Sequence, residues 1–279
     1  MIPPPVVLTI AGSDSGGGAG IQADIQTIAA NGGYAVCAIT SITAQNTCGV
    51  KTAFELPAPV IEAQIKAVAS DFTILAVKTG MLSSRKIVQT VARLIKKMAP
   101  SHWIVDPVMV SKNGYPLLKS DAISAMRTHL IPFASLVTPN IDEAEALSEI
   151  KIHSLEDVEK AAQVLHKLGC RAILIKGGHL QDHPGVDLFY DGSKKVLLKT
   201  TYIHSPHTHG TGCVYAAAIA TQLALGKPML SAIRKAKRYI TRTIEHGLAL
   251  GQGQGPVDPL YRLRQKGSWN ESRRVTCDH

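Results

Sequence analysis

The feature that most constrains the fold is an alternation of short apolar runs with helical patterns over the first 176 residues. The apolar runs have the length of strands, and each helical pattern is short enough to connect one strand to the next. Strands joined by such crossovers form a parallel sheet with helices on its faces. The expected strands are Val6–Ala11, Tyr34–Thr43, Ile74–Lys78, His102–Val105, Ser135–Thr138 and Arg171–Lys176. The expected helices are Gly20–Ala30, Ala58–Ser70, Arg85–Met98, Ser120–Leu130, Ile141–Leu147 and Leu155–Leu168.

The order of elements changes after residue 177. Residues 186–190 and 195–200 are typical of a hairpin around Asp191-Gly192-Ser193, and two consecutive helices follow at 210–225 and 228–250. We therefore expect an α/β fold whose mostly parallel central sheet ends in antiparallel edge strands. No linker precedes the glycine-rich loop at 251–256, so residues 1–266 are expected to form one domain. Residues 267–279 are expected to be a disordered basic tail.

The positive charge is concentrated near the C-terminal end. The chain has 279 residues and a net charge of +9, and residues 227–279 carry +7 of it, with eleven Lys and Arg against four Asp and Glu. A nucleic-acid-binding segment gathers its basic residues and interleaves aromatic ones for base stacking, and this segment does neither. We expect a solvated helix here and no nucleic-acid partner.

The lack of a recognisable targeting signal and the pattern of cysteines lead us to expect a cytoplasmic protein. No apolar run approaches the roughly 20 residues that a membrane span needs, and the N-terminus lacks the charged region of a signal peptide. The five cysteines are odd in number and form no C-x-x-C pair, which is untypical of a disulfide framework. We expect a reducing compartment and no membrane partner.

A glycine-rich turn, Gly12 to Gly20, follows the first strand at a place where open α/β sheets bind ligands. A nicotinamide site is excluded, because no Asp or Glu stands between Asp24 and Glu55 to hold a ribose, and no Walker A sequence occurs. Four glycines within five residues lose much conformational entropy on folding, a cost that a plain turn does not require. The turn therefore favours a ligand site over a simple connection.

A second turn, His209-Gly210-Thr211-Gly212-Cys213, directly precedes an apolar helix. The backbone N–H groups from Gly210 to Cys213 are expected to converge at the helix N-terminus and to form an anion hole. The helix dipole is expected to lower the pKa of the Cys213 thiol and to make it a base or a nucleophile. An inert buried cysteine is the alternative.

Polar residues at the ends of three other strands point to the same edge of the sheet. Asn140 and Glu143 stand three apart at a helix start, as a Mg²⁺ shell with bound water requires, and the same spacing also suits a helix-capping box. Asp106 closes one strand and Lys176 another, so both are expected at the ligand-facing rim. Zinc binding by His204, His207, His209 and Cys213 is disfavoured, because Pro206 interrupts the segment and no ligand pair lies in a helix.

Taken together, these elements resemble the hydroxymethylpyrimidine/phosphomethylpyrimidine kinases of thiamin biosynthesis, which are ribokinase-like proteins. The resemblance covers about residues 6–258 and includes eight segments in order. They are Ala11 to Asp24, Thr43-Ala44-Gln45-Asn46-Thr47, Lys78-Thr79-Gly80-Met81-Leu82, Val105-Asp106-Pro107-Val108-Met109, Thr138-Pro139-Asn140-x-x-Glu143-Ala144, Lys176-Gly177-Gly178-His179, Thr208 to Cys213 and Gly253-x-Gly255-Pro256-Val257. Two departures are His207, where the family commonly has Asn, and Tyr115, where an acidic residue is usual.

The resemblance implies a three-layer ribokinase-like sandwich, a homodimer, and two ATP-dependent phosphorylations. The first converts 4-amino-5-hydroxymethyl-2-methylpyrimidine to its monophosphate, and the second gives the diphosphate. The Gln45 carboxamide matches an aminopyrimidine edge, which has a ring-nitrogen acceptor beside an amine donor. The implied site residues are as follows: catalytic, Cys213, Gly210, Thr211, Gly212 and Lys176; substrate-binding, Gln45, Asp24, Gly12, Met81 and Val108; ATP-binding, Asn140, Lys176, Gly210 and Gly212; Mg²⁺-binding, Asp106, Asn140 and Glu143.

Two other functions stay open. A pyridoxal kinase of the same superfamily also phosphorylates a hydroxymethyl group on a nitrogen heteroaromatic ring, although Gln45 together with Met81 favours the aminopyrimidine. A non-catalytic nucleotide-sensing or nucleic-acid-binding protein would use the basic C-terminal portion. The intact turn from Gly210 to Cys213 argues against that second alternative.

Overall fold

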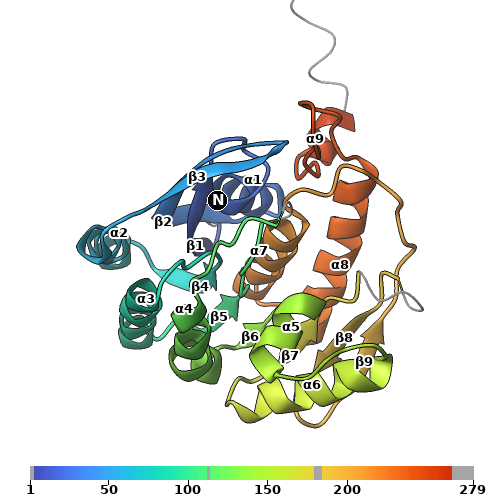
Figure 1. The fold of residues 1–279 in the computed structure, drawn as a ribbon. Helices are drawn as coiled ribbons and strands as arrows, with labels where there is room; N and C mark the ends of the chain where they lie inside the picture. The colour runs from blue at the N-terminus through green and yellow to red at the C-terminus, as the bar shows by residue number, and fades with distance from the viewer. Residues whose placement is uncertain (1–2, 112–113, 179–183, 266–279) are drawn as a thin grey trace, which may run out of the picture.

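The computed structural model describes residues 3–111, 114–178 and 184–265 (Figure 1). The nine strands of these ranges form one sheet in the order β3-β2-β1-β4-β5-β6-β7-β8-β9. The strands are β1 (Val6–Asp14), β2 (Tyr34–Asn46), β3 (Gly49–Glu55), β4 (Ile74–Thr79), β5 (His102–Val105), β6 (Leu136–Val137), β7 (Ile173–Ile175), β8 (Asp187–Tyr190) and β9 (Lys195–Leu198). The expected tail at 267–279 lies outside the described residues.

The middle of the sheet is parallel, as the alternation of strands and helices predicts. Strand β1 lies between β2 and β4 and pairs with both in parallel, and the parallel order continues through β7. Strands β8 and β9 are antiparallel, which confirms the hairpin expected at that edge.

The opposite edge contains a strand that the sequence analysis did not predict. Strand β3 pairs antiparallel with β2, so that Ile42 lies opposite Phe54. Its residues are half-buried or exposed. An edge strand of this kind lacks the strong apolar run of a buried strand, which explains why the sequence pattern did not identify it.

Helices cover both faces of the sheet and give the expected three layers (Figure 1). Helices α1, α7 and α8 pack together on one face, and the other face is covered by α2 to α6. The helices are α1 (Gly20–Ala30), α2 (Ala58–Asp71), α3 (Arg85–Met98), α4 (Ser120–Ala125), α5 (Ile141–Ser148), α6 (Leu155–Lys167), α7 (Thr211–Ala224), α8 (Met229–Glu245) and α9 (Tyr261–Gln265). Among the described residues, no helix combines the length and the apolarity needed to cross a membrane.

Two helices end earlier than their sequence patterns predict. The segment expected to be helical from 120 to 130 is an α-helix only to Ala125, and a π-turn follows at Met126–Leu130. Pro132 comes soon after, and a proline disfavours a regular helix before it. Helix α8 ends at Glu245 rather than at residue 250, and α9 was not predicted.

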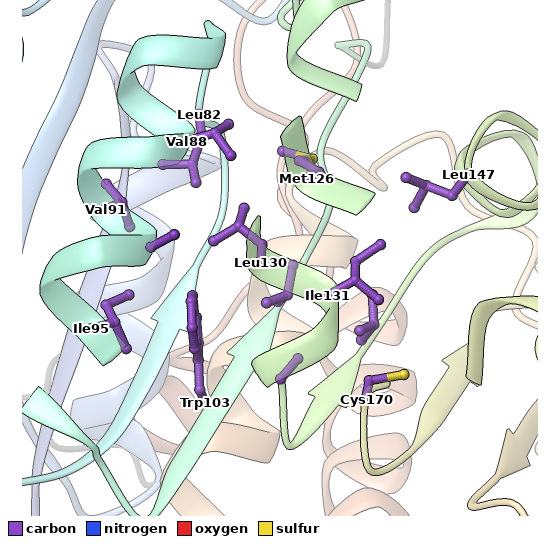
Figure 2. Close-up of a cluster of buried hydrophobic side chains, with 14 of the residues drawn as sticks. Leu82, Val88, Val91, Ile95, Trp103, Met126, Leu130, Ile131, Leu147 and Cys170 are labelled. Carbon is purple, nitrogen blue, oxygen red and sulfur yellow. The ribbon is translucent and has the colours of Figure 1, made fainter. Parts of the chain in front are cut away.

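The larger apolar core shows why α3 forms where it does. Val88, Val91 and Ile95 recur at helical spacing and face Trp103 of β5 and Leu130 (Figure 2). Burial of each such aliphatic side chain contributes about 1.5–3 kcal/mol to stability. Helix α7 is buried almost throughout and consists mainly of small residues, which lets it lie close to the sheet. This close packing fixes the α7 N-terminus at the strand ends.

Candidate active site

A cavity of about 400 Å³ opens at the carboxyl ends of the central strands. Such a volume lies within the range of small-molecule sites. The predicted site residues that line it are Gly12, Gln45, Met81, Asp106, Val108, Asn140, Glu143, Lys176, Gly210, Thr211, Gly212 and Cys213. The fold therefore brings all of the predicted site residues except Asp24 to one cavity.

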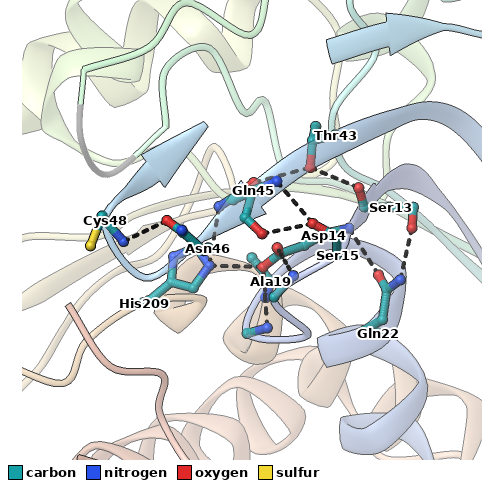
Figure 3. Close-up of polar contacts among 12 residues, drawn as sticks. Ser13, Asp14, Ser15, Ala19, Gln22, Thr43, Gln45, Asn46, Cys48 and His209 are labelled. Atoms are coloured by element: carbon teal, nitrogen blue, oxygen red, sulfur yellow. Dashed lines mark hydrogen bonds and ion pairs between the residues drawn. The ribbon is translucent and has the colours of Figure 1, made fainter. Parts of the chain in front are cut away.

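The glycine-rich turn after β1 is organised by Asp14 (Figure 3). Its carboxylate accepts the backbone N–H groups of Gly16 at 2.8 Å, Gly18 at 3.1 Å and Ala19 at 2.9 Å. Burial alone would raise the pKa of Asp14, but its hydrogen bonds to His209 and Gly16 hold that pKa below the usual value. The turn is thus closed around a charged carboxylate.

Glycine is required where this turn meets its neighbours. The pairing of β1 with β2 is irregular between Ala11 and Ser13, and Met81 lies so close that a Cβ at Gly12 would be 2.9 Å from its sulfur. Gly20 has a φ of +58°, and a Cβ there would lie 2.3 Å from the Gly12 carbonyl oxygen. A larger residue at Gly20 would meet backbone and would have to move the turn, whereas one at Gly12 would displace the Met81 side chain.

The N-terminus of α7 forms part of the predicted anion hole. Gly210 has a φ of +82° and begins the helix, and no side chain caps the first turn within the described part of the chain. The Thr211 N–H and hydroxyl both donate to the Thr208 carbonyl, at 3.3 and 2.7 Å. The expectation that all four amides converge is therefore corrected, because Thr211 closes the preceding turn. Gly212 and Cys213 retain the first-turn N–H groups that a helix cannot satisfy internally.

A buried ion pair faces this helix start. The Lys176 ammonium lies 2.8 Å from Asp106 Oδ1, which also accepts the Thr138 hydroxyl at 3.1 Å. Burial alone would raise the pKa of Asp106, but Lys176 and Lys78 hold it below its usual value. Asp106 Oδ2 is buried and has no partner within the described residues. One anionic oxygen is therefore left to face the cavity.

Asn140 and Glu143 form a capping box at the start of α5. Asn140 Oδ1 accepts the Glu143 N–H at 2.8 Å, and Glu143 Oε2 accepts the Asn140 N–H at 2.8 Å. Burial raises the pKa of Glu143 to about 7. Asn140 Oδ1 and Glu143 Oε2 therefore have a structural role, and both residues also line the cavity.

The expected low thiol pKa of Cys213 is wrong. Burial raises the pKa of Cys213 to about 11, and Lys78 opposes this only in part. The sequence pattern located the thiol at a helix N-terminus but did not show that Cys213 would pack against the apolar cluster formed by α1, α7 and the sheet. Burial therefore disfavours the thiolate of Cys213 in the ligand-free protein.

Asp24 also departs from expectation, because it lies beneath the cavity and not in its lining. Its carboxylate is fully buried, accepts the Thr9 hydroxyl at 2.5 Å, and lies 2.8 Å from the Lys78 ammonium. Burial alone would lower the pKa of Lys78, but Asp24 holds it well above the usual value. This pair supports the floor of the site, so a direct Asp24–substrate contact is corrected to a structural role.

Sequence reasoning missed two groups of cavity residues. Asp187 accepts the Tyr215 hydroxyl at 3.0 Å and lies 2.7 Å from Lys237, on the side lined by Ile240 and Ile244 of α8. These residues come from β8, α7 and α8, and no short motif joins them.

His209 is the other omission. Its Nε2 lies 2.9 Å from Asp14 Oδ2 and 3.3 Å from Gln45 Nε2. In the sequence, the only side-chain role weighed for His209 is that of a zinc ligand. Among the described residues, no group of three or more His, Cys, Asp or Glu is arranged to hold a metal ion.

Comparison with known proteins gives a consistent result. The model of a family described as phosphomethylpyrimidine kinase matches residues 14–258. A hydroxymethylpyrimidine/phosphomethylpyrimidine kinase from Synechococcus elongatus is 47% identical over 260 residues, which cover 93% of this chain and 98% of the relative. The solved phosphomethylpyrimidine kinase from Clostridium difficile is 43% identical, with a TM-score of 0.77 over 86% of this chain and 99% of that chain. An ADP complex of Bacillus subtilis pyridoxal kinase is 36% identical, with a TM-score of 0.87 over 93% of this chain and 99% of that chain.

The family model and the Synechococcus relative each cover most of the chain. The chain therefore belongs to the phosphomethylpyrimidine kinase family.

Proposed function

We propose that this protein transfers the γ-phosphoryl group of ATP to 4-amino-5-hydroxymethyl-2-methylpyrimidine, and then phosphorylates the resulting monophosphate to the diphosphate, in thiamin diphosphate biosynthesis. In each step an acceptor oxygen bonds to the γ-phosphorus, the bond to the ADP oxygen breaks, and one proton is released. The observation that supports the proposal is that Gln45 and the start of α7 line one cavity.

The ring is bound between the β1 turn and the β4 loop in this proposal. Gln45 supplies a donor and an acceptor in one plane, as an aminopyrimidine edge requires. Met81 and Val108 line the same part of the cavity, and the Met81 sulfur lies directly over Gly12. A thioether beside a glycine leaves a narrow apolar slot that suits a flat ring.

The nucleotide is bound on the other side of the α7 N-terminus. Ile240 and Ile244 give an apolar wall for a base, and the triphosphate would run towards Gly212 and Lys176. The Gly212 and Cys213 amides and the Lys176 ammonium are aimed at the place where negative charge must be stabilised. Each such donor is typically worth a factor of about 10² to 10³ in rate.

The residues present also suit Mg²⁺. The unpartnered Asp106 Oδ2 is a hard oxygen ligand, and Asn140 and Glu143 add oxygens at the same rim. Mg²⁺ bound with ATP would supply positive charge that offsets the charge of the phosphates. Such an ion needs only one or two carboxylates beside water and phosphate, which agrees with the small number of ligands here.

The raised thiol pKa changes the role proposed for Cys213. Its backbone N–H contributes to the anion hole, and its thiol lies beside the site as a neutral group. A loose phosphoryl-transfer transition state leaves the proton on the attacking hydroxyl until late, so little assistance from a base is required. Positioning and charge neutralisation then account for the reaction.

A coupled ADP-release assay with Mg²⁺ tests the proposal directly. The purified chain is given the hydroxymethylpyrimidine, its monophosphate or pyridoxal as acceptor, and the products are identified by mass spectrometry. We expect turnover with both pyrimidines. Turnover with neither pyrimidine would refute the proposal.

Pyridoxal phosphorylation is a second candidate activity. It is favoured by the fold similarity to the Bacillus subtilis pyridoxal kinase, whose chain is covered almost completely. The pyridoxal ring has no amine beside a ring nitrogen, so it cannot use both groups of Gln45 in the same way. We expect pyridoxal to be the poorer substrate, and the same assay gives the ratio.

We also propose that the protein is a cytoplasmic homodimer. On β2 and β3, the exposed side chains Ile42 and Phe54 lie opposite each other at the sheet edge. An exposed apolar edge of this kind is typical of a surface that a second copy covers. Light scattering at micromolar concentration checks the oligomeric state, and a monomer mass would contradict the dimer.

A further inference from the structure

His209 connects the glycine-rich turn to the ring-reading side chain (Figure 3). Its Nε2 faces Asp14 Oδ2 at 2.9 Å on one side and the Gln45 carboxamide at 3.3 Å on the other. The side chain of Asp14 is 4% exposed and that of His209 is 14% exposed, so water has little access to this contact. The function proposed above assigns no role to this pair.

The imidazole is held firmly in place. The His209 backbone N–H donates to the Gly255 carbonyl, and its own carbonyl accepts from Val257, both at 3.1 Å. The ring lies against Gly18, where an added Cβ would be only 2.4 Å from the imidazole Cδ2. The His209 ring therefore lies between Gly18 and Gln45, and a side chain at position 18 would displace it.

The available protons determine which end of the Gln45 carboxamide faces His209. The nitrogen beside the Asp14 carboxylate must carry its one proton to make that contact, so Nε2 has no lone pair left to accept an N–H from Gln45. The Gln45 atom 3.3 Å away is therefore the carboxamide oxygen, which shares the proton with Asp14. On the other flank, the Thr43 hydroxyl gives its one proton to the Ser13 carbonyl at 2.9 Å and lies 3.2 Å from the Gln45 amide. That hydroxyl is left as an acceptor, so it requires the amide N–H group.

Both requirements are met when the carboxamide oxygen faces His209 and the nitrogen faces Thr43, a 180° rotation that exchanges the two ends. We propose that His209, held by Asp14, is a positioning residue that fixes this direction of the Gln45 carboxamide and thereby selects a ring with an amine beside its ring nitrogen. One oxygen lone pair and one N–H of Gln45 then remain for the substrate.

The direction of the carboxamide determines the direction of the ring. An aminopyrimidine that pairs with the remaining lone pair and N–H binds in one orientation, which sends its hydroxymethyl group to one side. A reversed carboxamide would reverse the ring and point that group away from the α7 N-terminus. Pyridoxal cannot make both contacts, so its turnover is much less sensitive to this choice.

The inference rests on the proposed function, and the test keeps the two separate. His209→Leu removes the N–H donor of the imidazole. His209→Gln restores an N–H donor on a side chain of similar length. We expect His209→Leu to lower kcat/KM for the hydroxymethylpyrimidine about tenfold, the scale of one buried hydrogen bond. Pyridoxal turnover and the KM for ATP should change less than about twofold, and His209→Gln should restore part of the loss.

A double-mutant cycle with Gln45→Ala gives the sharper result. If His209 acts through Gln45, replacement of His209 in the Gln45→Ala background should leave the ratio of pyrimidine to pyridoxal turnover unchanged. If the two substitutions instead change this ratio by independent factors that multiply, or if turnover of the pyrimidine and of pyridoxal falls equally, His209 only supports the glycine-rich turn. Either result would overturn the inference.

Two further variants guard against misfolding and unspecific effects. Thr43→Val keeps the volume on the other flank but removes its acceptor, so it should lower the same ratio, whereas Thr43→Ser should not. His153→Leu, at an exposed position before α6, is the matched control and should behave like the unchanged chain. Absence of pyrimidine turnover in the unchanged chain would refute the proposed function, whereas normal turnover with an unaltered ratio in both His209→Leu and Thr43→Val would refute only this inference.

Discussion

The Lys176 ammonium and the Asp106 carboxylate form a buried pair with 2.8 Å between Nζ and Oδ1, and both groups face Gly212 at the start of α7. A Cβ at Gly212 would lie 3.3 Å from Lys176 Nζ and 3.7 Å from Asp106 Oδ2. The missing side chain therefore leaves space between a cation, an unpartnered anionic oxygen and a helix N-terminus. A phosphate with a metal ion would occupy this kind of space.

Gly212→Ala should reduce turnover without loss of the fold. The closest atom to the added methyl is the flexible end of Lys176, so the protein can accommodate it. The methyl occupies the approach of a phosphate to the α7 amides, and we expect kcat to fall about a hundredfold, the scale of one lost donor in such a site. Steady-state kinetics and the melting temperature, measured together, check this. Undiminished kcat in a folded variant would contradict the anion hole.

Lys78→Met should destabilise the protein strongly, because it leaves Asp24 buried without its cation. Removal of one partner from a buried ion pair typically costs about 3–5 kcal/mol. The double variant Lys78→Met with Asp24→Asn removes the unpaired charge, keeps an acceptor for Thr9, and should recover much of the loss. Urea unfolding of the three proteins measures the differences. Equal stabilities for the single and double variants would show that the Asp24 charge is not the cause.

The sequence predicted the elements that depend on local pattern. The strands at 6–11 and 102–105, the helix at 85–98 and the turn at 210–213 each depend on residues that are close in the chain, and each was found near its expected bounds. The free N–H groups at the start of α7 could be predicted for the same reason, because a helix start leaves its first N–H groups without intrahelical partners.

Other features depend on contacts between distant segments, which no local pattern records. Asp24 of α1 is paired with Lys78 of β4, and Cys213 packs against elements from both halves of the chain. A helix N-terminus favours a thiolate, but burial opposes it and is the larger effect here. His209 acquires its contacts from residues 14 and 45, so its position is visible only in the folded chain.

Glu143→Gln should stabilise the ligand-free protein at alkaline pH. Burial raises the pKa of Glu143 to about 7 from 4.5, so the folded state keeps its proton more readily than the unfolded state. The stability that this difference gives is complete below pH 4.5 and is lost as pH rises through about 7. Glutamine preserves the capping box and never ionises, so it avoids that loss.

Urea unfolding without Mg²⁺ and nucleotide measures the effect of Glu143→Gln. We expect the variant to gain about 2–3 kcal/mol in unfolding free energy relative to the unchanged chain between pH 4.5 and pH 8.5. Asp142→Asn, which removes a carboxylate from the exposed neighbouring position of the same helix, is the control. Parallel pH profiles for the unchanged chain and Glu143→Gln would contradict the raised pKa.

Cys213 should react slowly with iodoacetamide at neutral pH. With a pKa of about 11, only about one thiol in three thousand is ionised at pH 7.5, and burial also limits access. The exposed Cys48 should therefore be alkylated first, as peptide mass spectrometry would show. The rate at Cys213 should rise about tenfold for each pH unit between 7 and 9.5, and Cys213→Ser should lose that labelled peptide. A rate that is already at its plateau by pH 7 would instead indicate a thiolate, and it would return Cys213 to the role of catalytic base.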